Sequence, residues 1–412
     1  MSKVKKVVLA YSGGLDTSAI IPWLRENYQC EVIAYAADVG QGEELDPLHE
    51  KAKQSGASKL IIKDLKEEFA RDYVLPCLRA GAIYEGKYLL GTSVARPIIA
   101  KYQALIALEE GADAVAHGCT GKGNDQVRFE LAVRSIAPQL RIIAPWREWT
   151  MKSREDLLAY CAKHNVAVTA SAKKIYSMDR NLWHQSVEGG TLEDPWQSPS
   201  EDMYVLTKPP KDAPEPREIV ISFQEGVPTA VDGQAMTPAK LILFLNGTAG
   251  RYGIGRVDIV ESRLVGMKSH GVYEAPAATV LREAYEDLAR LVLDRESLWL
   301  RETLGPTYTR MVYDGRWFTV TREAMDAFFA TLGAKVTGEV RVRLDRGYCV
   351  AVGRRSPNSL YDPELATFGE DAVYRQKDAE GFIRLFGLPI EVEGRVRRRK
   401  LGSAPNFPEG GS

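Results

Sequence analysis

The feature that most constrains the fold is a regular alternation of short apolar runs and helical patterns over the first 165 residues. The apolar runs start about 25–30 residues apart, which is the length of one βαβ unit, and one longer gap leaves room for an extra pair of helices. The runs are apolar almost throughout, as expected for strands that helices cover on both faces. The sequence therefore predicts an α/β fold with a doubly wound parallel sheet, whose ligand lies beyond the carboxyl ends of the strands. The expected strands are Lys6–Ala10, Val32–Ala36, Leu60–Ile62, Ala114–Ala116 and Arg141–Ala144, and the expected helices are Thr17–Asn27, Pro47–Ser55, Ser93–Glu110, Gln126–Ile136 and Lys152–His164.

Beyond residue 168 the pattern changes to that of an α+β domain. Six prolines within residues 195–216 indicate an extended connection rather than a helix or strand. Two pairs of antiparallel strands are expected, one around residues 225–226 and one around residues 345–347. A helix with an apolar face is expected over 276–303. We therefore predict three regions, namely 1–168, 169–375 and a C-terminal helix and tail at 376–412.

Charge and cysteine content narrow the possible partners. The chain has 54 Lys and Arg against 55 Asp and Glu, a net charge of −1. This balance argues against a nucleic-acid-binding protein, which needs clustered positive charge, and the basic run Arg395–Lys400 is expected to be solvated or to contact another subunit. The five cysteines form no C-x-x-C pair, which argues against a disulfide framework and fits a reducing cytoplasm. No apolar stretch approaches 18 residues, so no membrane-spanning segment is expected.

A glycine-rich loop follows the first expected strand and carries the first chemical signal. The segment Ser12–Ser18 reads S-G-G-L-D-T-S, so a strand leads into a glycine turn and then into a helix. This arrangement directs backbone N–H groups and the positive end of a helix at one point, which suits a phosphate. Asp16 would repel a phosphate unless a cation lay between them, and it therefore points to Mg²⁺. The alternative is a plain turn in which Asp16 or Thr17 caps the helix.

Two further polar segments flank later helices. Residues 117–130 combine glycines with Thr120, Asn124, Asp125 and Arg128, and the guanidinium is suited to bind a carboxylate. The alternative for this segment is a glycine loop with Asp125 as a helix cap. Residues 88–97 place Thr92 and Ser93 before a helical run, and periodicity alone favours a structural cap there.

The loop at residues 12–18 resembles the PP-loop of the ATP pyrophosphatases, enzymes that cut ATP between its α and β phosphates. The segments YSGGLDTS, YLLGTSxARP and HGxTGKGNDQVRFE together resemble the argininosuccinate synthases in particular. The likeness continues through residues 144–147, 176–182, 255–261 and 266–274, and it covers residues 7 to about 360 in the family's order. Cys119 stands where the family pattern leads us to expect Ala, and Tyr176 where we expect Trp.

The resemblance implies an ATP-dependent ligase of arginine biosynthesis that joins citrulline and aspartate, releases AMP and pyrophosphate, and passes through citrullyl-AMP. For the fold, it implies an adenine nucleotide alpha-hydrolase-like first domain and a synthetase and multimerisation domain over 169–375. It also implies a cytoplasmic homotetramer. Mg²⁺ is expected to be bound with ATP rather than at a separate protein site. By resemblance, ATP contacts Ala10, Tyr11, Ser12, Gly13, Gly14, Leu15, Asp16, Thr17, Ser18, Ala37 and Gly118. Citrulline contacts Tyr88, Thr92, Ser93, Asn124, Arg128, Ser177, Ser186, Glu261 and Tyr273, and aspartate contacts Thr120, Asn124 and Asp125. The catalytic candidates are Asp16, Asp125 and Arg128.

Other functions are kept as alternatives. Another PP-loop synthetase is the nearest one, although a glutamine-using member usually adds a glutaminase domain with a catalytic Cys, and no such domain fits this chain. A nucleotide-binding regulator without turnover is the second, but a regulator has no use for two amino-acid sites. The role of His184, which lies between Ser177 and Ser186 in the sequence, is left open, with packing favoured over function.

Overall fold

The computed structural model describes residues 3–42, 45–166, 176–367, 369 and 373–400. The chain divides into two compact units, Met1–Leu360 and Tyr361–Ser412. We also predict domain boundaries at residues 168 and 375. Residue 168 lies outside the described residues, and both boundaries stay predictions. No helix among the described residues is long and apolar enough to cross a membrane.

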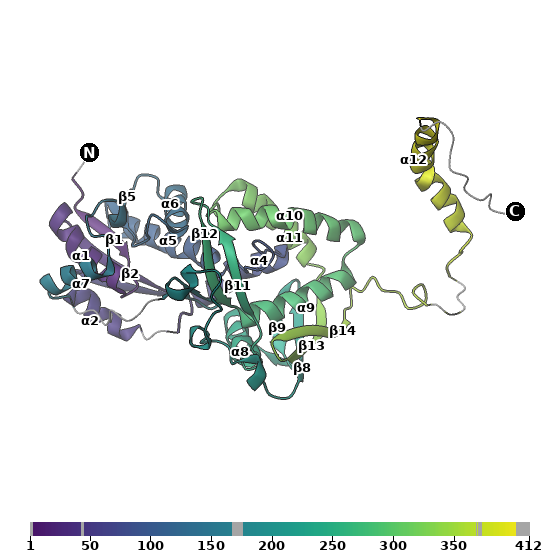
Figure 1. Cartoon of the computed structure of the whole chain (residues 1–412), viewed down its shortest axis with the longest axis horizontal. Helices are drawn as coiled ribbons and strands as arrows, with labels where there is room; N and C mark the ends of the chain where they lie inside the picture. Colours follow the sequence, from purple (N-terminus) through teal and green to yellow (C-terminus); the bar gives the residue numbers. More distant parts are fainter. Residues whose placement is uncertain (1–2, 43–44, 167–175, 368, 370–372, 401–412) are drawn as a thin grey trace. The chain divides into compact units, whose positions relative to one another are not determined.

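The first unit begins with the expected parallel sheet (Figure 1). Its five strands run in the order β3-β2-β1-β4-β5, and every neighbouring pair is parallel. The strand order reverses between β1 and β4, so the loops that follow these two strands open the crevice where ligands of such sheets bind. The predicted α/β class and the doubly wound sheet are confirmed. The strands are β1 (Lys6–Ala10), β2 (Glu31–Asp38), β3 (Lys59–Asp64), β4 (Ala114–Ala116) and β5 (Arg141–Ile143).

Helices pack on both faces of this sheet because both faces of its strands are apolar. Val7 and Leu9 of β1 lie in a buried cluster with residues of α1, whereas Val8 packs with residues of α5 and α6 on the opposite face. Gln103 of α5 joins the two central strands, since its Nε2 donates to the carbonyls of Val8 and Ala116 at 3.0 and 2.7 Å. The helices are α1 (Leu15–Tyr28), α2 (Asp46–Gln54), α5 (Gly91–Glu109), α6 (Asp125–Ile136) and α7 (Arg154–Lys163).

The long gap between β3 and β4 holds the additional helices that the sequence predicts. They are α3 (Lys66–Glu68), a π-helix (Phe69–Val74) and α4 (Leu75–Ala80), and α5 follows them.

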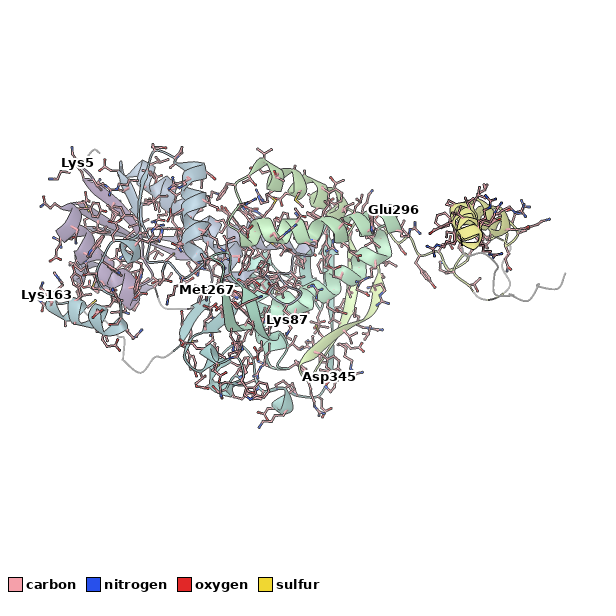
Figure 2. The ribbon with its side chains drawn as sticks, turned by 45° about the horizontal axis from the view of Figure 1, so that its top comes forward. Lys5, Lys87, Lys163, Met267, Glu296 and Asp345 are labelled. Carbon is pink, nitrogen blue, oxygen red and sulfur yellow. The ribbon has the colours of Figure 1, made fainter. Side chains whose placement is uncertain are left out.

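The second half of this unit is built around two antiparallel sheets. One has the order β10-β9-β8-β13-β14 and contains both predicted strand pairs, while the other has the order β11-β12-β7-β6 and was not predicted. In Figure 1 the β11–β12 pair lies between the parallel sheet and helices α10 and α11, and Met267, labelled in Figure 2, lies in the turn that joins these strands. The strands are β6 (Ser177–Arg180), β7 (Gln185–Glu188), β8 (Arg217–Gln224), β9 (Val227–Val231), β10 (Gln234–Ala235), β11 (Arg256–Ser262), β12 (Lys268–Glu274), β13 (Gly338–Asp345) and β14 (Tyr348–Arg355).

The single helix that we predict over 276–303 is wrong, because two helices occupy this range. The first ends at Val292, and the second begins at Arg295. The carboxylate of Asp294 accepts hydrogen bonds from the backbone N–H groups of Glu296 and Ser297, each at 3.0 Å, and so caps the second helix. The helices of this half are α8 (Pro238–Gly250), α9 (Pro276–Val292), α10 (Arg295–Tyr313) and α11 (Val320–Gly333).

The unit Tyr361–Ser412 contains one helix among its described residues, α12 (Asp378–Lys400). Ion pairs one turn apart lie along it, as between Arg384 and Glu380, where the N–O distance is 2.8 Å. Its large apolar side chains are nevertheless exposed, which leaves an apolar surface on an otherwise charged helix.

Candidate active site

The loop after β1 exposes the start of α1. Gly13 has a φ of +73°, a conformation that glycine adopts without strain, and the hydroxyl oxygens of Ser12 and Thr17 lie 3.2 Å apart. Gly14 occupies the N-cap position without a side-chain hydrogen bond, so no side chain caps the first backbone N–H groups of α1. An uncapped helix start beside hydroxyl groups is suited to a phosphate group.

Asp16 lies in the first turn of this helix. Burial raises the pKa of its carboxyl, while the positive charge of Arg154 acts in the opposite direction. A partly buried carboxylate next to a phosphate site fits a divalent cation held between the two, because Mg²⁺ is commonly bound by one or two carboxylates and phosphate oxygens. Among the described residues, no group of three or more His, Cys, Asp and Glu side chains forms a metal site of its own.

The loop after β4 lies directly against this helix start. A Cβ atom on Gly118 would lie 3.2 Å from Cγ2 of Thr17 and 3.4 Å from Cδ1 of Ile20. The absence of a side chain at Gly118 therefore lets the two loops approach closely. The predicted phosphate loop and the predicted aspartate loop are thus neighbours at the point where the strand order reverses.

Arg128 of α6 is buried at the end of α10. Its Nε donates to the carbonyl of Tyr313 at 2.9 Å, its Nη1 donates to Asp125 at 2.9 Å, and its guanidinium lies 4.9 Å from the centre of the Tyr313 ring. Within the part of the chain that the structure describes, Nη2 donates no hydrogen bond, so this edge of the guanidinium is available to a carboxylate ligand.

Asn124 connects the loop after β4 to the second half of the unit. Its Nδ2 donates to the Tyr313 hydroxyl at 2.9 Å, and its Oδ1 accepts from the backbone N–H of Leu264 at 2.8 Å. Both partners are far away in the sequence, so Asn124 joins three separate segments. Thr120 of the same loop is exposed.

Asp125 belongs to a chain of ion pairs that the sequence did not predict. Its two carboxylate oxygens accept from Arg128 and from Nε of Arg96 at 2.9 and 2.8 Å. Nη2 of Arg96 pairs with Asp179 of β6 at 2.9 Å. Burial lowers the pKa of Arg96, but Asp125 and Asp179 outweigh it, so this pKa lies above its ordinary value. Arg96 therefore joins α5, α6 and β6 as a permanent cation.

The start of α5 and the residues just before it hold three of the predicted citrulline residues. The Tyr88 hydroxyl oxygen accepts from the backbone N–H groups of Thr92 and Ser93 at 2.9 and 3.3 Å. Burial raises the pKa of Tyr88 to about 12, so the phenol stays protonated. The Ser93 hydroxyl is fully buried and has no hydrogen-bond partner among the described residues. A buried polar group without a partner is costly, and it is the kind of group that a polar ligand satisfies.

The sheet β11-β12-β7-β6 supplies the remaining predicted citrulline residues. Ser186 of β7 pairs in register with Tyr273 of β12, and both side chains are buried, whereas Ser177 of β6 is exposed. Glu261 of β11 is 4% exposed, and its Oε2 has no partner among the described residues.

The environment of Glu261 favours the neutral acid. Burial raises its pKa to about 7, and the neighbouring Glu188 adds to this effect, while Arg128 and Arg263 oppose it. A buried carboxyl in this position is suited to a cationic ligand such as an ammonium group, which would favour the ionised form.

His184, the residue just before β7, fixes the orientation of the Thr92 hydroxyl at the start of α5. Burial acts to raise the pKa of Asp179, but Arg96 outweighs it, so Asp179 is ionised and accepts from the Thr92 hydroxyl at 2.9 Å. The Thr92 oxygen then accepts from Nε2 of His184 at 3.1 Å, because its own hydrogen is already donated. Burial lowers the pKa of His184, which makes it a neutral side chain that orients Thr92.

The two departures from the family pattern are accommodated locally. Cys119 is a free thiol beside the site, and burial raises its pKa, so it is present as the unreactive thiol. Tyr176 is partly buried, and its hydroxyl lies 3.1 Å from that of Thr191.

The structure thus brings most of the predicted residues to one place and adds others that sequence reasoning missed. The added residues are Arg96, Asp179, Glu188, Arg263 and Tyr313. One signal was available for Arg96, because a charged side chain next to the apolar residues at the start of a buried helix needs a carboxylate partner. Tyr313 gave no local signal, since its hydrogen-bond partners lie 51 to 189 residues away in the sequence.

Two family models together match nearly the whole chain. The model of the arginosuccinate synthase N-terminal HUP domain matches residues 6–167, and that of the arginosuccinate synthase C-terminal domain matches residues 176–393. The fold and the site therefore define a nucleotide-binding enzyme built on a HUP domain.

Full-length relatives specify the family. The chain is 57% identical to the argininosuccinate synthase of Roseiflexus sp. (strain RS-1), over 97% of this chain and 99% of the relative. It is 58% identical to that of Carboxydothermus hydrogenoformans, over 96% and 98%, and 56% identical to the chloroplastic one of Arabidopsis thaliana, over 96% and 81%. The chain belongs to the argininosuccinate synthase family, and it is a ligase of arginine biosynthesis that joins citrulline and aspartate.

Proposed function

We propose that this ligation takes place at the crevice between β1 and β4, with ATP on the loop after β1 and the two amino acids beside it. ATP lies against Ala10 to Ser18, with Ala37 and Gly118 at its sides. The observation that carries this proposal is the contact between the two loops, where Gly118 meets the first turn of α1. The triphosphate and the substrate carboxylates then lie within one site.

Mg²⁺ is proposed to accompany ATP, with Asp16 as the protein group nearest to it. The cation supplies charge neutralisation for the departing pyrophosphate. Asp16 is suited to this role because its carboxylate lies in the first turn of α1, where a phosphate would otherwise face a negative charge.

Citrulline is proposed to lie between Arg128 and Glu261. The free edge of the Arg128 guanidinium binds the carboxylate, and the buried Glu261 binds the ammonium group. The neutral ureido group lies among hydroxyl and amide groups, which hydrogen-bond it without a charge. These groups are Tyr88, Thr92, Ser93, Asn124, Ser177, Ser186 and Tyr273.

Aspartate is proposed to lie at the loop after β4, on Thr120, Asn124 and Asp125. The Asp125 carboxylate holds the incoming amine, and each of its oxygens keeps a lone pair beyond the bonds from Arg96 and Arg128. In the first step the ureido oxygen bonds to the α-phosphorus and pyrophosphate leaves. In the second the aspartate nitrogen bonds to the ureido carbon, and AMP leaves with the oxygen. Much of the acceleration comes from holding these groups in line.

The remaining predictions concern assembly and location. A homotetramer is supported by the exposed apolar side chains of α12, and the five free cysteines are compatible with the predicted cytoplasmic location. All residues of the proposed site lie between positions 10 and 273 of one chain.

The deciding experiment is product analysis. With ATP, citrulline and aspartate, the enzyme is expected to release AMP and pyrophosphate in equal amounts and to form argininosuccinate. A positional isotope test with ¹⁸O in the citrulline ureido group should transfer the label to AMP, as citrullyl-AMP requires. Release of ADP and phosphate, or unlabelled AMP, would reject the proposal.

A further inference from the structure

We propose that Tyr313 is a positioning residue for the amino-acid substrates: it holds Asn124, Arg128 and the strand end that carries Glu261 in one fixed arrangement. The inference rests on the proposed function of this site. Tyr313 is the last residue of α10 and is 1% exposed. It belongs to none of the residue sets that the family resemblance implies.

Tyr313 contacts α6 through three different groups. Its carbonyl oxygen accepts from Nε of Arg128, its ring lies beneath the Arg128 guanidinium, and its hydroxyl accepts from Nδ2 of Asn124. The carbonyl lies at the C-terminal end of a helix, where the helix dipole favours a cation. Gly315 lets the chain pass close by, since a Cβ there would lie 2.8 Å from Cα of Arg128.

The same tyrosine also contacts the end of β11. The Tyr313 hydroxyl donates to the carbonyl of Ser262 at 3.0 Å, and the Tyr84 hydroxyl donates to that carbonyl at 2.7 Å. The two tyrosine rings are stacked, with centroids 3.6 Å apart and an interplanar angle of 6°. Ser262 follows Glu261 directly, so the stacked pair anchors the backbone next to the carboxyl that is proposed to bind the citrulline ammonium.

The direction of these hydrogen bonds leaves one arrangement. The Ser262 carbonyl can only accept, so the Tyr313 hydroxyl donates to it and accepts from the Asn124 amide. The Leu264 N–H donates to the other side of the same amide. The Asn124 side chain is therefore oriented from both ends, with its oxygen and its nitrogen in defined places.

This arrangement matters because an α-amino acid carries its carboxylate and its ammonium group on one carbon atom. A site for it must hold its cationic and its acidic side chain at a matching separation. Here Arg128 and Glu261 come from different halves of the unit, 133 residues apart in the sequence. Tyr313 contacts both segments, and it is therefore suited to set their separation.

The experiment compares steady-state kinetics of Tyr313→Phe with the parent enzyme. Loss of the hydroxyl leaves the Asn124 amide without its acceptor, while the ring beneath Arg128 stays in place. We expect KM for citrulline and for aspartate to rise about 3- to 10-fold, the range for one neutral hydrogen bond. We expect kcat to stay within about twofold and KM for ATP to stay unchanged. Tyr313→Leu also removes the ring, and a further rise of KM for citrulline is expected.

Two matched variants separate positioning from general stability. Tyr308→Phe removes a buried hydroxyl from the same helix, one that donates to Asp326 at 2.6 Å, and it should lower the melting temperature without changing either KM. Tyr84→Phe leaves the Asn124 contact in place and should raise the two KM values less than Tyr313→Phe does. Unchanged KM values in Tyr313→Phe, or an equal rise in Tyr308→Phe, would overturn the inference. If the parent enzyme itself does not use citrulline and aspartate, it is the proposed function that fails instead.

Discussion

At the scale of single residues, the Glu261 carboxyl links protonation to substrate binding. Burial raises its pKa from 4.5 to about 7, so about half of the carboxyl is protonated at pH 7 in the folded protein without substrate. An ammonium group bound beside it favours the ionised form and lowers the pKa. Citrulline binding at pH 7 is therefore expected to release protons. Titration calorimetry in two buffers with different ionisation enthalpies should give different apparent binding enthalpies, and Glu261→Gln should abolish that difference.

The same carboxyl makes the stability of the unliganded enzyme depend on pH. A raised pKa in the folded state contributes stability that is complete below about pH 4.5 and is lost as the pH rises to about 7. Glu261→Gln removes this loss, so the melting temperature of the variant should exceed that of the parent at pH 8, with a smaller gain at pH 5. Equal gains at both pH values would show that Glu261 does not titrate in this range.

Arg128 gives the second prediction at this scale. Arg128→Ala should lower kcat/KM for citrulline by an amount equivalent to about 2–5 kcal/mol, the range for truncating one partner of a buried charge pair. Arg134→Ala is the control, because Arg134 lies on the same helix but is two-thirds exposed, where an ion pair contributes little. Unchanged kinetics in Arg128→Ala would show that this arginine does not bind citrulline.

At the scale of elements, the turn between β1 and α1 gives a prediction on nucleotide binding. Gly13→Ala would place a Cβ 2.3 Å from Cδ2 of Leu48, so the Leu48 side chain or the loop must shift, and the alanine would be strained at a φ of +73°. We expect KM for ATP to rise about tenfold or more, because an alanine strained in this left-handed conformation distorts the turn that presents its N–H groups to phosphate. Gly111→Ala has a similar positive φ and open space, and it should cost some stability without changing KM for ATP.

The parallel sheet was predictable because its strands are apolar on both faces and alternate with helices at regular spacing. Strands β1 and β4 begin and end at the predicted residues. The sheet that holds Ser186, Glu261 and Tyr273 was not predictable. Its strands β6 and β7 are only four residues long and polar, and β7 pairs with residues 83 to 89 positions further along the chain. The substrate residues on this sheet were predicted only through the family resemblance. The Arg96–Asp179 pair and the contacts of Tyr313 join segments far apart in the sequence, so only the folded structure shows them.

At the scale of the whole molecule, α12 exposes an apolar stripe that we expect another apolar surface to cover. Phe382, Phe386 and Ile390 recur at intervals of four residues, each is 64–70% exposed, and the two phenylalanine rings are stacked with centroids 5.2 Å apart. A helix with such a stripe is stable in water when another apolar surface covers it, and in the proposed homotetramer a second copy of the chain would cover it. Phe386→Asp should therefore produce a smaller species in sedimentation experiments. Lys377→Asp introduces the same side chain at an exposed polar position just before α12 and should leave the mass unchanged.

The activity of that smaller species tests whether assembly and chemistry are separate. All residues of the proposed site lie within the unit Met1–Leu360, and so does Tyr313, whereas α12 lies within the other unit. The dissociated Phe386→Asp variant should therefore keep kcat within a few-fold of the parent, and its thermal stability should fall because the bound partner no longer stabilises the folded state. A parent-like mass would contradict the assembly role of α12. A smaller mass with complete loss of activity would show that a neighbouring subunit contributes to the site.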